Sequence, residues 1–161
     1  MIVSDRLVWI ELATSGPDPE TDRIERVSAV ITDKDLAVVA QTGAVEVDEV
    51  GPAQARVLSM VKEQVGEGVA LLGGTRVQDV RRFLAVQMPE LFEYLHYRNV
   101  DLTTLRELVR RWYPAVFEAR PNAGADPSIA SAIRELSYYR ETVFRAPEPA
   151  EAGAESEDAR E

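Results

Sequence analysis

Cysteine and histidine, which often act as nucleophiles, bases or metal ligands, are scarce in this sequence. Its 161 residues include no cysteine and one histidine, His96. The absence of cysteine excludes disulfides and thiolate metal sites, and it fits a reducing compartment. A zinc site would have to combine the single histidine with carboxylates. Chemistry at a metal would therefore rest mainly on aspartate and glutamate.

The net charge of −10 argues against binding of long nucleic acid, which requires a basic surface. Half of this charge lies near the C-terminus, because residues 146–161 contain six acidic residues and one basic residue, which leaves −5 for residues 1–145. This segment of proline, alanine and glutamate lacks the apolar surface that would offset its ordering entropy. We therefore expect a disordered acidic tail over residues 146–161, and a short ligand on the domain is compatible with the charge.

The length favours one globular domain over residues 1–145. No stretch approaches the roughly 20 apolar residues of a membrane span, and no basic region precedes the first apolar run. We therefore expect a cytoplasmic protein without membrane association.

Several segments have the residue pattern of β-strands. Residues 7–13 (LVWIELA) form a nearly continuous apolar run, which is typical of a strand buried on both faces. Residues 23–32 and 36–47 predict two more strands in an antiparallel meander. Residues 69–74 predict a short buried strand, and residues 98–102 are a further candidate.

Between these strands the apolar spacing becomes helical. It predicts a helix after Gly51-Pro52, one over residues 76–88, another turn from Pro89, one over residues 103–113 and a last helix beginning near Asp126-Pro127-Ser128. Asp126 is interpreted as the capping residue of that last helix. The inward-facing side chains are predicted to be Val57, Leu58, Val61, Val65, Val77, Val80, Phe83, Leu84, Leu102, Leu105, Leu108, Val109, Ile129, Ile133, Leu136 and Val143. The order βββαβαβα predicts an α/β, ribonuclease H-like fold with a mixed five-stranded sheet flanked by helices.

Three segments resemble the oligoribonuclease family, whose members are small dimeric 3′→5′ exoribonucleases. They are LVWIELATSG followed by DPETDRI, RRFLAVQMPELFEYLHYRNVDLTTLRELVRRWYP, and IRELSYYRETVF, and the resemblance extends over residues 5–145. It implies two Mg²⁺ or Mn²⁺ ions, held by carboxylates from the first strand and two later helices, which activate a water and stabilise the departing 3′ oxygen. It also implies a histidine that acts as base.

The first strand departs from this pattern at two positions. Glu11 stands where the family has an aspartate, and Ala13 stands where it has the glutamate that bridges both ions. The extra methylene of Glu11 displaces its carboxylate, and a misplacement of about 1 Å can cost on the order of 10²-fold in rate. Ala13 supplies no ligand. Glu11 is therefore either a polar remnant of a decayed site or a residual metal ligand.

The later motifs have changed as well. A gapless match places Val80 at the family's metal-binding aspartate, whereas a match with one inserted residue would make Asp79 the ligand. One inserted residue rotates the rest of a helix by about 100°, so we prefer Val80. Counting back from Ile133 in the last helix places Ala123 at the family's histidine and Ser128 at its aspartate. Glu11 and Asp79 are then the candidate metal ligands, and we expect no bound cofactor.

The substrate-binding positions are partly retained. Arg76 replaces a serine that helps to hold the 5′ phosphate, and it is either a substitute phosphate ligand or a surface arginine at a helix start. Pro17 replaces the leucine that wedges between the bases. The family resemblance persists at Tyr97 and Arg98, with Thr103 following, in a region that lies at the dimer interface of the family and reaches the partner's active site.

These observations favour a catalytically inactive homodimer that acts by binding a protein partner or a short oligoribonucleotide such as a linear dinucleotide. One alternative is an active 3′→5′ exoribonuclease that uses relocated ligands at Glu11, Asp79 and Asp126. Another is an interaction protein that pairs with a catalytic paralogue through the dimer surface.

Overall fold

The apolar run near the N-terminus forms the central strand of the sheet. The computed structural model describes residues 4–121 and 128–144, and it contains a five-stranded sheet in the order β3-β2-β1-β4-β5. The strands are β1 (Leu7–Thr14), β2 (Ile24–Thr32), β3 (Val38–Glu46), β4 (Leu71–Gly74) and β5 (Asn99–Asp101). β1, β2 and β3 form an antiparallel meander, and β4 and β5 add parallel strands on the other side. The predicted mixed α/β sheet is confirmed.

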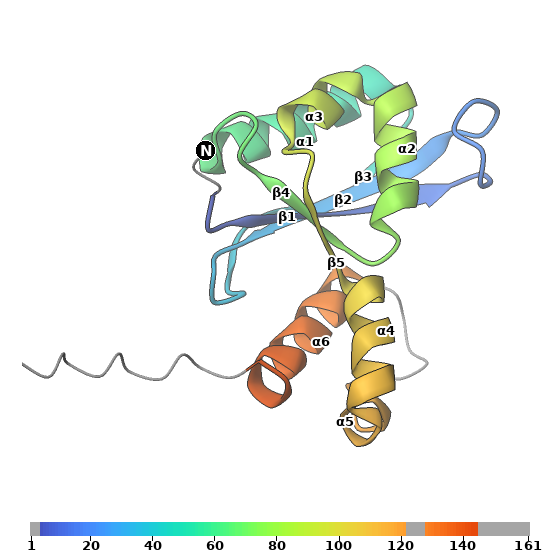
Figure 1. The fold of residues 1–161 in the computed structure, drawn as a ribbon. Coiled ribbons are helices and arrows are strands. Elements are labelled where there is room, and N and C mark those ends of the chain that lie inside the picture. Colours follow the sequence, from blue (N-terminus) through green and yellow to red (C-terminus); the bar gives the residue numbers. More distant parts are fainter. Residues whose placement is uncertain (1–3, 122–127, 145–161) are drawn as a thin grey trace, which may run out of the picture.

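Helices cover both faces of this sheet (Figure 1). They are α1 (Val50–Gln64), α2 (Val77–Gln87), α3 (Pro89–Tyr94), α4 (Leu102–Trp112), α5 (Pro114–Glu118) and α6 (Ile129–Thr142). Figure 1 shows α1, α2 and α3 on one side of the strands and α4, α5 and α6 on the other. No helix within residues 4–121 and 128–144 is long and apolar enough to cross a membrane.

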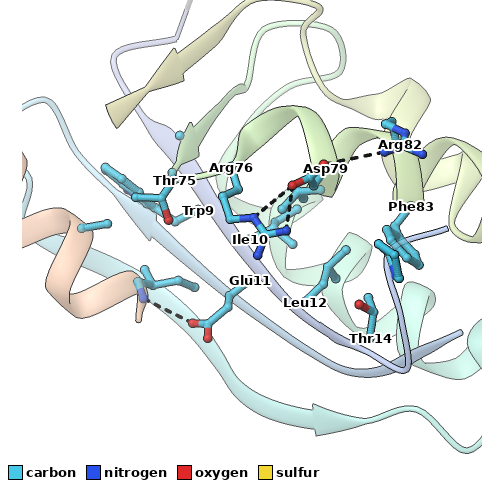
Figure 2. A pocket seen from close by; sticks show the side chains of 16 residues that line it. Trp9, Ile10, Glu11, Leu12, Thr14, Thr75, Arg76, Asp79, Arg82 and Phe83 are labelled. Carbon is cyan, nitrogen blue, oxygen red and sulfur yellow. Dashed lines mark hydrogen bonds and ion pairs between the residues drawn. The ribbon is translucent and has the colours of Figure 1, made fainter. Parts of the chain in front are cut away.

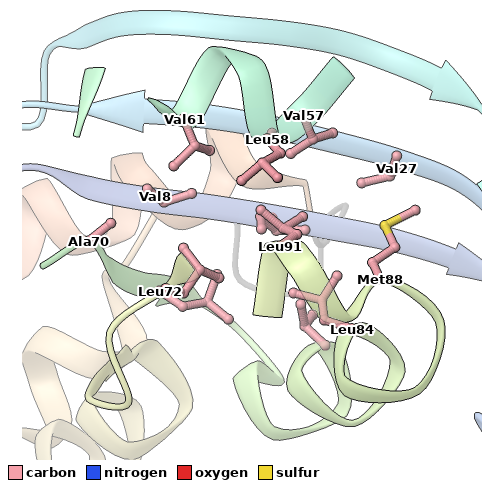
Figure 3. Close-up of a cluster of buried hydrophobic side chains, with 14 of the residues drawn as sticks. Val8, Val27, Val57, Leu58, Val61, Ala70, Leu72, Leu84, Met88 and Leu91 are labelled. Carbon is pink, nitrogen blue, oxygen red and sulfur yellow. The ribbon is translucent and has the colours of Figure 1, made fainter. Parts of the chain in front are cut away.

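Strand β1 faces two separate hydrophobic cores, which explains why its apolar residues do not alternate with polar ones. Val8 points into the core under α1, α2 and α3 (Figure 3), and Ile10 belongs to the same core. Trp9 points the other way, into the core under α4 and α6. Its indole Nε1 donates a buried hydrogen bond of 2.9 Å to Thr32 Oγ1 on β2. The prediction of a strand buried on both faces is therefore confirmed.

Four details of the predicted elements were wrong. The strand predicted over residues 69–74 begins only at Leu71, and α5 was not predicted. Leu108 was expected to face inward, but it is exposed. Asp126 was expected to cap the last helix, but the N-cap of α6 is Ser128, whose Oγ accepts a hydrogen bond of 3.3 Å from the Ser131 amide. Asp126, Ala123 and the tail at 146–161 lie outside the described residues.

Candidate functional site

A pocket lies where three elements meet: the C-terminal half of β1, the junction between β4 and α2, and the start of α6 (Figure 2). Its volume is about 200 Å³. A water requires roughly 10–15 Å³ by such a measure, so the pocket has room for a ligand much larger than a water. The lining residues are Trp9, Ile10, Glu11, Leu12, Thr14, Pro17, Gly73, Gly74, Thr75, Arg76, Asp79, Val80, Arg82, Phe83, Ile129 and Ala132.

Glu11 is the acidic residue that β1 contributes to this pocket. Its Oε2 accepts a hydrogen bond of 3.3 Å from the backbone amide of Ile129, the first residue of α6. The first amides of a helix have no partner within the helix and carry partial positive charge, so they favour a carboxylate. Glu11 therefore fastens the N-terminus of α6 to the sheet, a role that needs no metal.

The opposite wall of the pocket carries two arginines that share one carboxylate. The Asp79 Oδ2 lies 3.0 Å from Arg76 Nε and 2.9 Å from Arg76 Nη2, and its Oδ1 lies 3.8 Å from Arg82 Nη1. In Figure 2 the guanidinium of Arg76 lies between Asp79 and Glu11. Asp79, one of the two candidate metal ligands, is therefore already paired with two cations.

The backbone of Arg76 is unusual for a residue with a side chain. It has φ 55, in the left-handed region, at the position just before α2 begins. This conformation costs a residue other than glycine about 1–2 kcal/mol. It occurs at the rim of the pocket, and strained residues of this kind cluster at functional sites.

The remaining degenerate positions supply no metal ligands. Val80 borders the pocket, but its side chain is packed into the hydrophobic core beneath α2. It therefore offers no oxygen to a metal. Ala13 lies two residues after Glu11 and so on the same face of β1, and its methyl group does not line the pocket. Ser128 is used as the cap of α6.

A pair of magnesium ions does not fit this set of side chains. Mg²⁺ requires oxygen ligands in near-octahedral geometry, usually with one or two carboxylates for each ion. Within residues 4–121 and 128–144, no three acidic or histidine side chains gather in a group that could hold a metal. The two carboxylates at the pocket, Glu11 and Asp79, are occupied by an amide and by two arginines.

The structure places Tyr97, Arg98 and Thr103 outside this pocket. Tyr97 is 70% exposed, and Arg98 Nε donates a hydrogen bond of 3.2 Å to its hydroxyl. The turn is held from beneath by the buried His96, whose Nδ1 accepts a hydrogen bond of 3.0 Å from the Arg98 amide. Thr103 is exposed on the first turn of α4, where its amide is capped by Asp101. The chain by itself does not bring these residues to Arg76.

A buried ion pair positions α6 relative to α4. Glu135 on α6 is almost fully buried, and it accepts hydrogen bonds of 2.7 and 2.6 Å from Arg106 Nε and Nη2 on α4. These bonds raise the pKa of the Arg106 guanidinium. The Tyr139 hydroxyl donates a third bond of 2.8 Å to Glu135, and burial, followed by this bond, raises the pKa of Tyr139. The network holds α6, and with it the Ile129 amide, at the pocket.

Arg82 was not predicted as a site residue. The signal was present in the spacing, since residues 76, 79 and 82 follow one another at intervals of three and so lie on one face of a helix. A basic–acidic–basic series at this spacing predicts a shared carboxylate. It does not predict that the group faces a pocket, because that depends on β1 and α6.

Curated proteins with similar sequences are oligoribonucleases. The oligoribonucleases of Vibrio campbellii and Bordetella pertussis are 34% and 36% identical over 181 and 177 residues, covering 90% and 88% of this chain and 99% and 97% of those proteins. The mitochondrial oligoribonuclease of Homo sapiens is 31% identical over 178 residues, covering 89% of this chain and 75% of that protein. These alignments are longer than the 161-residue chain, so the relatives contain residues with no counterpart here.

Solved structures of exonuclease I share the fold. The exonuclease I from Methylocaldum szegediense matches with a TM-score of 0.56 at 16% identity, covering 84% of this chain and 40% of that one. An E. coli exonuclease I–ssDNA complex matches with a TM-score of 0.62 at 14% identity, covering 86% of this chain and 40% of that one. The chain thus spans about two fifths of the length of these structures. No protein-family model matches the chain. Because identities above 30% extend over nearly the full length of bacterial relatives, the chain belongs to the oligoribonuclease family.

Proposed function

We propose that this chain is a catalytically inactive member of the oligoribonuclease family that acts through binding, with a short oligoribonucleotide as its ligand. The observation that supports the proposal is the occupation of both pocket carboxylates. Glu11 accepts a hydrogen bond from the Ile129 amide, and Asp79 is paired with Arg76 and Arg82. Each Mg²⁺ needs oxygen ligands in near-octahedral geometry, and two carboxylates that are held by other partners do not provide that arrangement for two ions.

Two further positions that the family resemblance assigns to metal ligands argue in the same direction. Ala13 and Val80 are apolar, and the burial of Val80 in the core means that α2 cannot offer another side chain there without moving. Two-metal hydrolysis requires ligands that hold both ions about 3.5–4 Å apart on the two sides of the reacting phosphate. Glu11 and Asp79 cannot supply that number of ligands.

The proposal is tested by incubating the full chain with a 5′-phosphorylated diribonucleotide in the presence of Mg²⁺ or Mn²⁺. The oligoribonuclease of Vibrio campbellii serves as a positive control. We expect no turnover within the ordinary range of enzymes, which begins at about 1 s⁻¹. Turnover at that rate that is lost in Glu11→Gln would refute the proposal.

A second candidate is an active 3′→5′ exoribonuclease with relocated ligands. The observation in its favour is that Glu11 and Asp79 line the same pocket, on opposite walls. In this case metal binding must break the pairs of Asp79 with both arginines. Hydrolysis should then fall in both Glu11→Gln and Asp79→Asn but not in Arg140→Gln, which alters an exposed arginine paired with Asp35 away from the pocket.

The proposal includes a homodimer formed through the turn around Tyr97 and Arg98. A tyrosine that is 70% exposed, with an arginine over its ring at 5.6 Å, presents the residue types that most often dominate interfaces. Light scattering should give twice the chain mass of 17.9 kDa, and Tyr97→Ala with Arg98→Glu should reduce it to one chain mass without loss of helix content. A single chain mass for the unmodified protein at tens of micromolar would exclude this dimer.

The same surface also suits a catalytic paralogue as partner. Mixing the chain with an active oligoribonuclease of the same cell and measuring the mass of the mixture distinguishes the two arrangements. A cytoplasmic location belongs to the proposal as well, supported by the absence of cysteine from the sequence.

A further inference from the structure

We infer that the pocket binds a terminal phosphate directly through Arg76 and Arg82, without a divalent metal, and that Asp79 is an internal counter-ion which the phosphate displaces. The inference rests on the proposed function, because it assigns the ligand chemistry of the same pocket. It reverses the role of the site: where the family resemblance implies carboxylates that hold cations, this chain presents cations that hold an anion.

The geometry of the arginine pair carries the first step. Both guanidinium groups belong to the pocket wall, and both reach the same carboxylate, at 2.9 Å for Arg76 and 3.8 Å for Arg82. An anion placed where the Asp79 carboxylate now lies would therefore contact both cations. A guanidinium offers two parallel N–H groups that match the oxygens of a phosphate.

The pairs that must be broken are weak. The side chains of Arg76, Asp79 and Arg82 are 76%, 45% and 57% exposed, and ion pairs that are open to water contribute little to stability. A terminal phosphate carries about 1.5 to 2 negative charges at neutral pH and has three acceptor oxygens, compared with one charge and two oxygens on Asp79. A terminal phosphate can therefore compete with Asp79 for the two guanidinium groups.

The other walls of the pocket indicate which class of phosphate-bearing ligand can bind there. Its other walls include Trp9, Phe83 and Ile129, which are buried and apolar, and the cavity of about 200 Å³ extends from the arginines across β1 to α6. Such a surface suits the base and sugar of a nucleotide better than it suits water. Glu11, on the opposite wall, would repel a second phosphate placed deep in the pocket. The ligand class is therefore an oligoribonucleotide or nucleotide that presents one terminal phosphate to Arg76 and Arg82.

The two possible roles of Asp79 predict opposite effects of one substitution. If Asp79 is a metal ligand, Asp79→Asn weakens ligand binding, because the metal that bridges protein and phosphate is lost. If Asp79 is a counter-ion, the same substitution strengthens binding, because it frees both arginines. A unit charge removed at a distance of about 4 Å in water changes an affinity by roughly fivefold.

The experiment is a fluorescence anisotropy titration of the full chain with a 3′-labelled diribonucleotide that carries a 5′-phosphate, in EDTA and in Mg²⁺. The same diribonucleotide with a 5′-hydroxyl is the ligand control. The variants are Arg76→Gln, Arg82→Gln and Asp79→Asn, and Arg140→Gln is the matched control because Arg140 is also an exposed, carboxylate-paired arginine. Circular dichroism confirms that each variant is folded.

We expect binding in EDTA that depends on the 5′-phosphate, falls roughly tenfold or more in Arg76→Gln and Arg82→Gln, and rises about fivefold in Asp79→Asn. Arg140→Gln should bind as the unmodified chain does. Binding that requires Mg²⁺ and is lost in Asp79→Asn would overturn the inference, as would equal affinity for both diribonucleotides or no binding at all. Because EDTA prevents metal-dependent hydrolysis, this result is independent of the turnover assay. Absence of both binding and turnover would overturn the inference and the proposed oligoribonucleotide ligand, whereas the proposed catalytic inactivity would stand. Metal-dependent turnover would instead overturn the proposed inactivity.

Discussion

Arg106→Met removes the guanidinium that holds Glu135 between α4 and α6. The Glu135 side chain is 3% exposed, so it cannot replace the two lost hydrogen bonds of 2.7 and 2.6 Å with water unless the helices separate. Removal of one partner from a buried ion pair costs about 3–5 kcal/mol. Because the Arg106 side chain is 35% exposed, the lower end applies, about 3 kcal/mol. For a domain of this size that loss lowers Tm by about 10 °C.

The loss is measured by urea unfolding at neutral pH, followed by far-ultraviolet circular dichroism. Arg110→Met is the control, since its pair with Glu107 is half exposed and should contribute about 0.5 kcal/mol or less. The double variant Arg106→Met with Glu135→Gln removes the buried charge but keeps an acceptor for Tyr139, so it should recover most of the lost stability. A loss below about 1 kcal/mol in Arg106→Met, or equal losses in the single and double variants, would refute the argument from buried charge.

Three further outcomes follow from the structure. Burial raises the pKa of Tyr139, so the contribution of the Tyr139 hydroxyl to stability is complete below the ordinary pKa of 10.0 and declines as pH rises above it. In urea unfolding, Tyr139→Phe should flatten this decline of the unfolding free energy with pH. An unchanged dependence on pH would contradict this. The hydrogen bond from Arg140 lowers the pKa of Asp35 below 3.8, so this stabilisation is present above that pH and is lost on acidification; carboxyl NMR should show Asp35 returning towards 3.8 in Arg140→Gln. Gln87→Ala removes hydrogen bonds of 2.9, 2.6 and 3.1 Å that fasten residues 19–24 to α2, so we expect a loss of about 2 kcal/mol and faster hydrogen exchange there, whereas unchanged exchange would refute the role.

Much of the fold was predictable because local patterns and long-range packing agree. The run over residues 7–13 lacks alternation because Val8 and Trp9 enter different cores, which is the arrangement that the run predicts. The five residues of α5 are too few to show a period, so that helix was missed. Leu108 was misplaced for another reason: helical spacing identifies an apolar face, but whether a neighbour covers it depends on which elements the fold brings there.

The missing metal ligands of the candidate site were easier to predict than the contacts that its remaining charged residues make. Replacement of a carboxylate by Ala13 or Val80 removes a ligand in any fold, so the lost ligands could be identified once the family resemblance had placed these residues at metal-binding positions. The pairing of Asp79 with Arg82 follows from their helical spacing, but its position at a pocket depends on β1 and α6. The hydrogen bond from the Ile129 amide to Glu11 joins residues 118 positions apart, which local sequence does not specify.

The α/β class, the central apolar strand and the near absence of cysteine and histidine could be read from the sequence, because each of these follows from composition or from the period of neighbouring residues. The roles of the charged residues depend instead on the packed fold. It placed Glu11 under the first amide of α6 and set Arg76 and Arg82 around one carboxylate at the rim of a pocket. These roles arise from packing β1, α2 and α6 together, since the free energy of a charge depends on the distance and burial of its partners rather than on its position in the chain.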